Sequence, residues 1–419
     1  MASALTLSQI GLLVAPWESS RAEGLRRLHC FLPSAGQAYA ATRNFDHGPS
    51  DRSNVSTLSP YLRHRLILEH EVVEEVLKQT SFSNAEKFLQ EVCWRTYWKG
   101  WLELRPTVWT DYRLRVHQTL ASMDQDSVLR DRWEQATTGK TGIDCMNVWA
   151  CELLETGYLH NHARMWFASL WIFTLGLPWE LGADFFYRHL LDGDPASNTL
   201  SWRWVAGLQT RGKTYLAQAE NINRFTSGRF HPKEPLARVA NPVAGPPLPA
   251  PRLLPPAEAL PGAEYGLLIT EEDLDPASLG LDLAQVQAVA GIVDSRLRSE
   301  LPVGQAATHF TSAAMDDALS RASESLGRST ERLDSRSWED SVTQWAVRQG
   351  IQQIVTAYPP QGPTCEKMAP LRAALAQEGI LLSMIRRPWD NRFWPHATSG
   401  FFPFKEKIPQ TLQALGIQA

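Results

Sequence analysis

Polar side chains able to hold a large planar cofactor recur between residues 158 and 204, in a segment otherwise rich in aromatic residues. They are Asn161, Arg164, Asp192, Asp194 and Asn198. Carboxylates suit ribose hydroxyl groups, an amide suits the redox edge of a flavin, and apolar faces suit the flavin ring. The Asp-Gly-Asp turn, the asparagine four residues after it and the Trp-x-Trp at 202–204 therefore predict a buried flavin site.

Two serines close to a predicted helix start could contact phosphate. The stretch from Ser56 to Ser59 reads STLS and comes directly before Pro60. A helix N-terminus presents free N–H groups and the positive end of the helix dipole, which suit a phosphate. An ordinary helix cap is the competing interpretation and, for this motif alone, the commoner one.

Tryptophan is unusually abundant in this chain. There are 16, and eleven of them lie between Trp94 and Trp204. Such clustering favours a stacking surface or a redox role for some of the rings. The plain alternative is a large aromatic core.

The first half of the chain is predicted to be mainly α-helical. Apolar residues recur at helical spacing in the segments 81–104, 146–154, 160–175 and 178–190. In the first of these, Ser83 is the expected N-cap. Glu91, Trp94 and Arg95 are three and four residues apart and so fall on one face of that helix.

A proline-rich segment divides the chain. Eight prolines between residues 242 and 261 exclude a persistent helix or central strand. Residues 241–262 are therefore predicted to be an extended linker between a helical domain, 1–240, and a second domain, 263–419.

The second domain is predicted to be α/β. Short apolar runs at 264–270, 352–357 and 379–384 alternate with helical segments at 283–301, 312–326, 337–349 and 365–378. Strands that alternate with helices predict a parallel, Rossmann-like sheet. No glycine-rich nucleotide fingerprint follows any of these strands.

Composition argues against several classes of protein. The five cysteines include no Cys-x-x-Cys pair, so we expect no disulfide scaffold, no metal site and a reducing, cytoplasmic location. The net charge of −4 argues against a chain that is basic throughout, but it allows a local basic face. The apolar run 10–15 has no basic residues before it, and the run 165–177 is too short to cross a bilayer. We therefore expect no signal peptide and no membrane partner. We also expect the protein to be a monomer.

Four motifs resemble those of the photolyase/cryptochrome family, over residues 15–232. The segment 91–95 (EVCWR) resembles Glu-Leu-x-Trp-Arg, and the segment 160–165 (HNHARM) resembles His-Asn-Arg-x-Arg-Met of the pyrimidine-dimer photolyases. The segment 192–198 (DGDPASN) resembles Asp-Gly-Asp-x-Ala-x-Asn. The serine stretch 56–59 resembles the family's phosphate-contacting stretch.

The resemblance implies FAD as the cofactor. It assigns cofactor contacts to Tyr39, Ser56, Leu58, Ser59, Arg95, Asn161, Arg164, Asp192, Asp194 and Asn198. Trp179 and Trp202 match two members of the tryptophan chain through which the family passes electrons to photoexcited flavin. The residues implied to act at a DNA lesion are Glu91, Trp94, Asn161, Met165, Asn198 and Trp204, with His162 and Arg203 contacting the DNA.

The chain departs from the family pattern in several respects. His162 stands where relatives have a DNA-contacting arginine. Asp126 stands at the place of the outer tryptophan, so Trp133 or another tryptophan would have to replace it. The helical domain precedes the α/β domain, and the tail 397–405 resembles the end of the family's α/β domain, an order similar to a circular permutation. The family's antenna residues cannot be matched one by one, so an antenna chromophore has no support.

The resemblance implies light-driven repair of cyclobutane pyrimidine dimers in DNA, by an electron given from photoexcited reduced FAD to a dimer flipped out of the duplex. The first alternative is a blue-light photoreceptor, cryptochrome-like, or another non-repair flavoprotein of the same fold. The permuted domain order, His162, Asp126 and the acidic net charge favour it. The second is a helical binding module with an unrelated α/β domain, which no nucleophile elbow, Walker motif or metal cluster supports.

Overall fold

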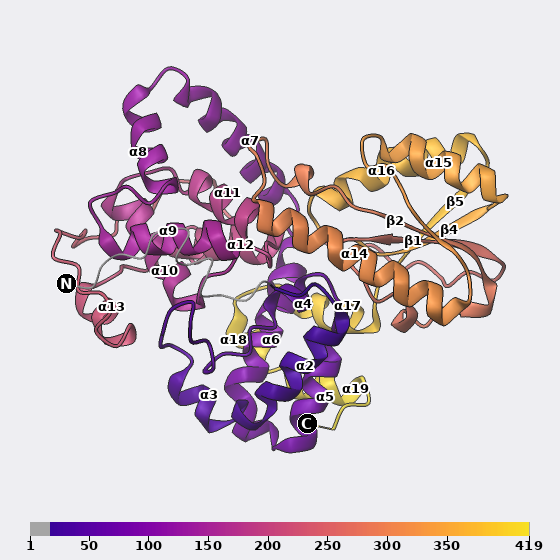
Figure 1. Ribbon diagram of the computed structural model, residues 1–419, viewed down its shortest axis with the longest axis horizontal. Helices are drawn as coiled ribbons and strands as arrows, with labels where there is room; N and C mark the ends of the chain where they lie inside the picture. The colour runs from indigo at the N-terminus through magenta and orange to yellow at the C-terminus, as the bar shows by residue number, and fades with distance from the viewer. Residues whose placement is uncertain (1–16, 419) are drawn as a thin grey trace.

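The computed structural model describes residues 17–418, so the apolar run 10–15 lies outside the described residues. The first half of the chain is helical, and the second half contains a sheet (Figure 1). The helices of the first half are α2 (Arg21–Phe31), α3 (Gln37–Thr42), α4 (Ser59–Arg63), α5 (Glu69–Gln79), α6 (Phe82–Glu103), α7 (Thr107–Met123), α8 (Ser127–Thr137), α9 (Asp144–Thr156), α10 (Asn161–Ser169), α11 (Trp179–His189), α12 (Pro195–Val205) and α13 (Ala219–Phe225). The prediction of a mainly helical first half is confirmed.

Helix α6 carries three of the predicted site residues on a rigid, largely buried rod. It has 22 residues and begins where the sequence predicts. Its N-cap is Ser81, whose hydroxyl accepts the backbone N–H of Asn84 at 3.3 Å. The prediction of Ser83 as the cap was wrong, because Ser83 lies inside the first turn and its hydroxyl contacts that of Ser81.

The predicted helix 160–175 consists of two kinds of helix. Helix α10 begins at Asn161, and the ring of His160 caps it by accepting the N–H of His162 at 3.2 Å. A π-helical turn, Leu170–Thr174, follows α10 directly. π-Helical turns are rare in proteins, and those that occur are often found at functional sites.

The second half of the chain contains a sheet of five parallel strands. They are β1 (Tyr265–Thr270), β2 (Val286–Ile292), β3 (Thr330–Arg332), β4 (Gln353–Ala357) and β5 (Leu381–Ile385). Their order in the sheet is β3-β2-β1-β4-β5, with β1 at the centre. The predicted parallel α/β sheet is therefore confirmed.

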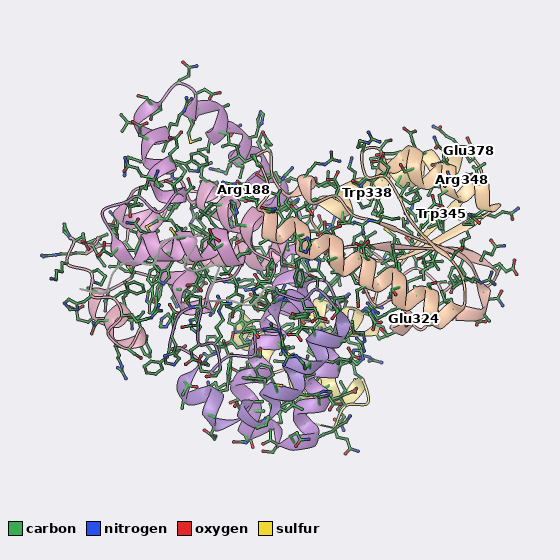
Figure 2. All side chains as sticks on the ribbon, in the orientation of Figure 1. Arg188, Glu324, Trp338, Trp345, Arg348 and Glu378 are labelled. Atoms are coloured by element: carbon green, nitrogen blue, oxygen red, sulfur yellow. The ribbon has the colours of Figure 1, made fainter. Side chains whose placement is uncertain are left out.

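Helices cover both faces of this sheet. Helix α14 (Gln305–Leu326) lies on one side, and α15 (Trp338–Gln349) and α16 (Pro363–Gln377) lie on the other (Figure 1). Leu267 and Ile269 of β1 belong to the same hydrophobic cluster as α14, whereas Leu268 belongs to the cluster of α15 and α16. This is the period-two alternation of a strand that is buried on both faces. Figure 2 labels Trp338 and Trp345 of α15, which are 2% and 1% exposed.

The prediction of a helix at 283–301 was wrong, because strand β2 occupies the centre of that segment. A strand covered on both faces reads as a continuous apolar run, and periodicity alone does not separate such a run from a buried helix. Gly291 marks the close packing of α14 on β2, since a Cβ there would lie 2.6 Å from the sulfur of Met315. Strand β3 has only three residues and gave no signal in the sequence.

The last part of the chain returns to the helical half. Helices α17 (Pro388–Phe393) and α18 (Phe401–Lys405) pack on α6, and α19 (Ile408–Ala414) packs on α17 (Figure 1). The indole N–H of Trp389 donates to the hydroxyl of Thr96 at 2.9 Å, and the hydroxyl of Tyr97 donates to the carbonyl of Ser399 at 2.6 Å. Residues far apart in the sequence thus share one helical layer.

The proline-rich segment runs between α13 and β1 without helix or strand. The backbone N–H of Arg252 donates to the carbonyl of Leu104 at 2.8 Å. Glu258 pairs with Arg372 of α16 at 2.7 Å. The segment therefore contacts both halves of the molecule. Among residues 17–418, no helix is both long and apolar enough to span a bilayer.

Glu103, the last residue of α6, joins the helical half to the loop after β4. It accepts the backbone N–H of Gln361 at 2.5 Å and the hydroxyl of Tyr358 at 3.0 Å. Burial raises the pKa of Glu103 from 4.5 to about 7, because these two hydrogen bonds offset only part of the cost of burying the charge. When folding raises the pKa of a carboxyl group, stability falls as the pH rises between the unfolded and folded pKa values.

We expect Glu103→Gln to remove this loss of stability. Between pH 4.5 and 7 the free energy of unfolding of the native protein should fall relative to that of the variant, by up to about 3 kcal/mol. Urea titrations of both proteins, below and above this pH range, measure the difference. An identical pH dependence in the two proteins would contradict the assignment of Glu103.

Candidate functional site

The Asp-Gly-Asp turn leads directly into helix α12. Asp194 is the N-cap of that helix, and its Oδ1 accepts the backbone N–H of Ser197 at 2.7 Å. Pro195 takes the first helical position, where its missing N–H costs nothing. The local sequence therefore fixes the Asp194 carboxylate, which is only 1% exposed.

Three cations surround the Asp194 carboxylate. Its Oδ2 lies 3.5 Å from Nζ of Lys99, 3.7 Å from Nη1 of Arg95 and 3.9 Å from Nε of Arg63. Burial opposes ionisation, but Lys99, Arg95 and Arg63 together hold the pKa of Asp194 well below its usual range. Arg63 is also neutralised by Glu272, through two hydrogen bonds of 2.8 and 2.9 Å.

Several buried polar atoms at this point have no hydrogen-bond partner among the described residues. They are Nη1 of Arg95, Nζ of Lys99, Oδ2 of Asp194 and Oγ of Ser197. Buried polar atoms are almost always paired, so each of these needs a partner other than the described residues. Two cationic donors, a carboxylate and a hydroxyl fit the diphosphate and ribose hydroxyls of a dinucleotide.

Asp192 adds a second carboxylate to the same turn. It is 5% exposed and accepts one hydrogen bond of 3.0 Å from each of the two terminal nitrogens of Arg164. Burial opposes ionisation here too, but Arg164 and Arg95 keep the pKa of Asp192 below its usual range. Ser59, the first residue of α4, also contributes to lowering the pKa of Asp192. The structure thus brings together four residues that the sequence predicts at one site: Ser59, Arg95, Arg164 and Asp192.

Asn198 lies on α12, four residues after Asp194. Its amide nitrogen donates to the carbonyl of Ala183 on α11 at 2.7 Å, and the residue is 8% exposed. This bond fixes the amide group and leaves its oxygen as the free acceptor. Asn161, by contrast, begins α10 and is exposed.

The remaining predicted cofactor residues lie on α3 and just before α4. Tyr39 is 8% exposed, and the Arg43 guanidinium lies 5.9 Å from its ring centre. The hydroxyl of Ser56 accepts the N–H of Leu58 at 3.4 Å. Leu58 is 1% exposed, so it can offer only apolar contact.

Glu91 and Trp94 face two different partners on the surface of α6. Glu91 forms an ion pair with Arg43. The ring of Trp94 is stacked on Phe401 of α18, with centres 3.6 Å apart and planes inclined by 11°. One face of the Trp94 ring is therefore covered by the chain itself.

Tyr215 joins His162 to Trp204. The His162 ring stacks on Trp166 at 4.1 Å and contacts the carbonyl of Asn44 through Nδ1 at 2.9 Å. Burial lowers the pKa of His162, so the neutral ring predominates at neutral pH. The ring of Trp204 stacks on Tyr215, whose hydroxyl lies 3.4 Å from Nε2 of His162.

Arg203, Met165 and the two predicted redox tryptophans complete the set. Arg203 is 7% exposed and lies 6.0 Å from the ring centre of Trp179. Burial lowers the pKa of Arg203 to about 10. Trp179 and Trp202 are 3% and 2% exposed, on α11 and α12, and Met165 on α10 is partly buried.

Sequence reasoning missed Lys99 and the role of Arg63. Lys99 comes four residues after Arg95 on α6, so helical spacing could have identified it. Arg63 lies in a basic stretch, RHR, that the sequence shows without indicating a partner. Only the fold places Arg63 beside the carboxylate of Asp194, which comes 131 positions later in the sequence.

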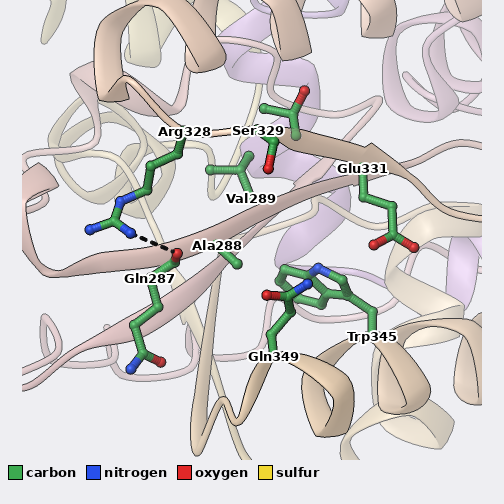
Figure 3. Close-up of a pocket in the computed structure, with 9 residues that line it drawn as sticks. Gln287, Ala288, Val289, Arg328, Ser329, Glu331, Trp345 and Gln349 are labelled. Carbon is green, nitrogen blue, oxygen red and sulfur yellow. Dashed lines mark hydrogen bonds between the residues drawn. The ribbon is translucent and has the colours of Figure 1, made fainter.

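A separate pocket of about 430 Å³ lies at one edge of the sheet. Figure 3 shows its lining, which comes from β2, β3, the turn before β3 and α15. Arg328 donates to the backbone carbonyl of Gln287 there, at 3.2 Å. No predicted site residue lines this pocket.

Comparisons with known proteins match the helical half. Residues 88–243 match the family model described as the FAD binding domain of DNA photolyase. The chain is 31% identical over 193 residues to a deoxyribodipyrimidine photo-lyase of Alkalihalophilus pseudofirmus, covering 46% of this chain and 38% of that protein. It is 32% identical over 170 residues to one of Streptomyces griseus, covering 40% of this chain and 36% of that protein.

Two solved structures resemble the chain over part of their length. One is a cryptochrome of Synechocystis, with 22% identity, a TM-score of 0.43, and coverage of 51% of this chain and 44% of the cryptochrome. The other is a class III photolyase of Agrobacterium tumefaciens, with 25% identity, a TM-score of 0.42, and coverage of 50% of this chain and 43% of the photolyase. The chain thus spans less than half the length of these relatives.

Proposed function

We propose that the protein uses blue light and FAD to repair pyrimidine dimers in DNA, because residues 88–243 match the model of the FAD binding domain of DNA photolyase. The observation that carries the proposal is the set of unpaired buried groups around Asp194, inside the matched domain. Bound FAD would supply a light-driven one-electron donor. The chain supplies the binding, the orientation and the exclusion of water.

The proposed cofactor contacts follow from charge and burial. Arg95 and Lys99 would bind the diphosphate, because these two cations share the single negative charge of Asp194. Asp192 and Asp194 would accept ribose hydroxyl groups. The amide oxygen of Asn198, held by its bond to Ala183, would lie at the redox edge of the ring.

The proposed lesion contacts come from the same domain. Glu91 would hydrogen-bond the reacting base, and Trp94, Met165 and Trp204 would provide apolar contact for a dimer flipped from the duplex. Before Glu91 can do so, its ion pair with Arg43 has to open. A base can stack only on the face of Trp94 that Phe401 leaves free, or it has to displace Phe401.

A cryptochrome-like photoreceptor is the second candidate. The covered face of Trp94 and the partly buried, neutral His162 favour it, because the first offers less surface to a flipped base and the second offers no charge to phosphate. In that case FAD would bind as proposed, but no dimer would be repaired.

A repair assay separates the two functions. The FAD-loaded, reduced protein should restore a dimer-containing oligonucleotide under blue light and not in the dark. Glu91→Gln should lower the repair rate roughly 10- to 100-fold, because a hydrogen bond to a charged group contributes about 1.5–3 kcal/mol.

Glu86→Gln is the matched control for the assay. Glu86 lies on the same helix, five residues before Glu91, and pairs with Lys405 at 2.9 Å. The Glu86→Gln variant should repair the oligonucleotide at the native rate. If the native protein binds FAD but repairs no faster in light than in the dark, the photoreceptor replaces the enzyme.

A further inference from the structure

We propose that electrons enter the tryptophan chain at Trp109, which passes them to Trp179 through the ring of Tyr112, while Glu366 takes the indole proton of Trp109. This inference rests on the proposed function, because it concerns how electrons reach the flavin. It assigns an outer member to a chain whose expected outer position holds Asp126. That residue caps α8 by accepting the N–H of Leu129 at 2.9 Å, and a carboxylate cannot relay an electron.

The inner half of the route follows from Gly182 on α11. A Cβ at Gly182 would lie 2.3 Å from the Trp202 ring, so this ring rests directly on the backbone of α11. Trp179 lies three residues before Gly182, on the same face of that helix. The Trp202 ring therefore packs on α11 about one helical turn from Trp179.

The outer half is a continuous series of ring contacts from α11 to α7. The rings of Trp179 and Tyr112 have centres 5.7 Å apart, and those of Tyr112 and Trp109 have centres 5.4 Å apart. All three rings are at most 3% exposed, so water does not separate them. Trp109 and Tyr112 lie three residues apart on α7 and hence on one face.

Tyr112 acts as a bridge and does not hold the charge. Its hydroxyl is buried without a hydrogen-bond partner among the described residues. Burial, with Asp184 nearby, raises the pKa of this phenol well above its usual value. An oxidised tyrosine that cannot release its proton is high in energy, so the charge moves on to Trp109.

The indole proton of Trp109 has an acceptor at the surface of the protein. The indole N–H donates to Oε1 of Glu366 on α16 at 2.6 Å. Trp109 is 1% exposed, whereas Glu366 is exposed to solvent. The contact thus links a buried ring to the surface, across the boundary between the helical half and the α/β half.

The electrons and protons of this step balance. Trp202 would supply one electron to bound, photoexcited FAD and would regain one from Trp179, which would regain one from Trp109 through Tyr112. Trp109 then loses its indole proton to the Glu366 carboxylate and remains as a neutral radical. A small-molecule thiol added in solution reduces that radical and becomes oxidised, and the proton returns from Glu366.

Transient absorption and electron paramagnetic resonance of the FAD-loaded protein test the route. After a blue flash, the native protein should form a long-lived neutral tryptophan radical. Trp109→Phe should lose that signal, and its flavin photoreduction by thiol should fall to the level of Trp179→Phe. Trp345→Phe, which changes an equally buried ring in α15, should behave as the native protein.

Two further variants separate a redox role from a structural one. Glu366→Gln changes an exposed side chain and should convert the neutral radical into a shorter-lived protonated one, which has a different absorption spectrum. Tyr112→Phe should keep the native yield because the bridging ring remains, whereas Tyr112→Leu should lose it.

The outcomes also distinguish this inference from the proposed function. If the native protein binds no FAD or is not photoreduced, the proposed function fails. If the native protein is photoreduced and Trp109→Phe matches it in yield and radical lifetime, electrons enter elsewhere and this inference fails.

Discussion

Replacement of Asp194 by asparagine is expected to lower the free energy of unfolding by about 3–5 kcal/mol and to abolish FAD retention. The carboxylate is 1% exposed and lies within 4 Å of Lys99, Arg95 and Arg63. An asparagine would still cap α12, but it would leave the buried positive charges without their shared counter-charge. Urea unfolding without added FAD measures the stability, and absorption of the purified protein measures FAD retention.

The effect should also depend on pH. Since the folded protein holds the pKa of Asp194 below its usual value, the stabilisation is present above the unfolded pKa and is lost as the pH falls through the folded pKa. The variant should therefore lack part of the loss of stability that the native protein shows in acid.

Asp126→Asn is the control for the Asp194 variant. Asp126 is also a helix N-cap, but it is exposed and has no buried cation beside it. Because asparagine caps as well as aspartate, this variant should change stability by less than about 1 kcal/mol. If both variants cost the same, the cap and not the charge explains Asp194.

The second large effect is expected for Asp273→Asn, at the carboxyl end of β1. Asp273 receives two hydrogen bonds from Arg387, of 2.6 and 2.8 Å, and one of 3.3 Å from Arg65 of the helical half. Burial opposes ionisation of Asp273, but Arg387 and Arg65 outweigh it and lower the pKa. Loss of this charge leaves the buried Arg387 guanidinium without its carboxylate partner, while Arg65 keeps Asp390, and should cost about 3–5 kcal/mol.

An exposed ion pair provides the comparison for Asp273. Glu331 and Arg348 lie 2.6 Å apart, but their side chains are 41% and 53% exposed. Glu331→Gln should therefore cost no more than about 1 kcal/mol. Urea unfolding of both variants measures the two effects. Equal losses in the free energy of unfolding would show that burial does not strengthen the contribution of Asp273 to stability.

The sequence predicts those parts of the site that lie on one element or on consecutive turns. Asp192, Asp194 and Asn198 are close because a turn and a capped helix place them so. Helix α6 and strands β1, β4 and β5 were recognisable because their apolar periodicity is local. These are properties of short segments, which a single sequence records.

Contacts between distant segments could not be predicted. Phe401 covers Trp94 across 307 positions, and Arg65 reaches Asp390 across 325 positions. The helical spacing that suggested a helix over β2 was misleading because burial on both faces removes the alternation of a strand. Lys99 was predictable from spacing alone, whereas Glu272 as the partner of Arg63 was not.

The return of α17, α18 and α19 to α6 has a consequence for biosynthesis. Trp101 and Phe404 belong to one hydrophobic cluster, so that cluster stays open until synthesis has passed the sheet and reached the final helices. The helical half, although made first, therefore cannot finish packing on the ribosome before the α/β half has emerged. During that interval the apolar surface around Trp101 stays exposed to solvent or is covered by a chaperone.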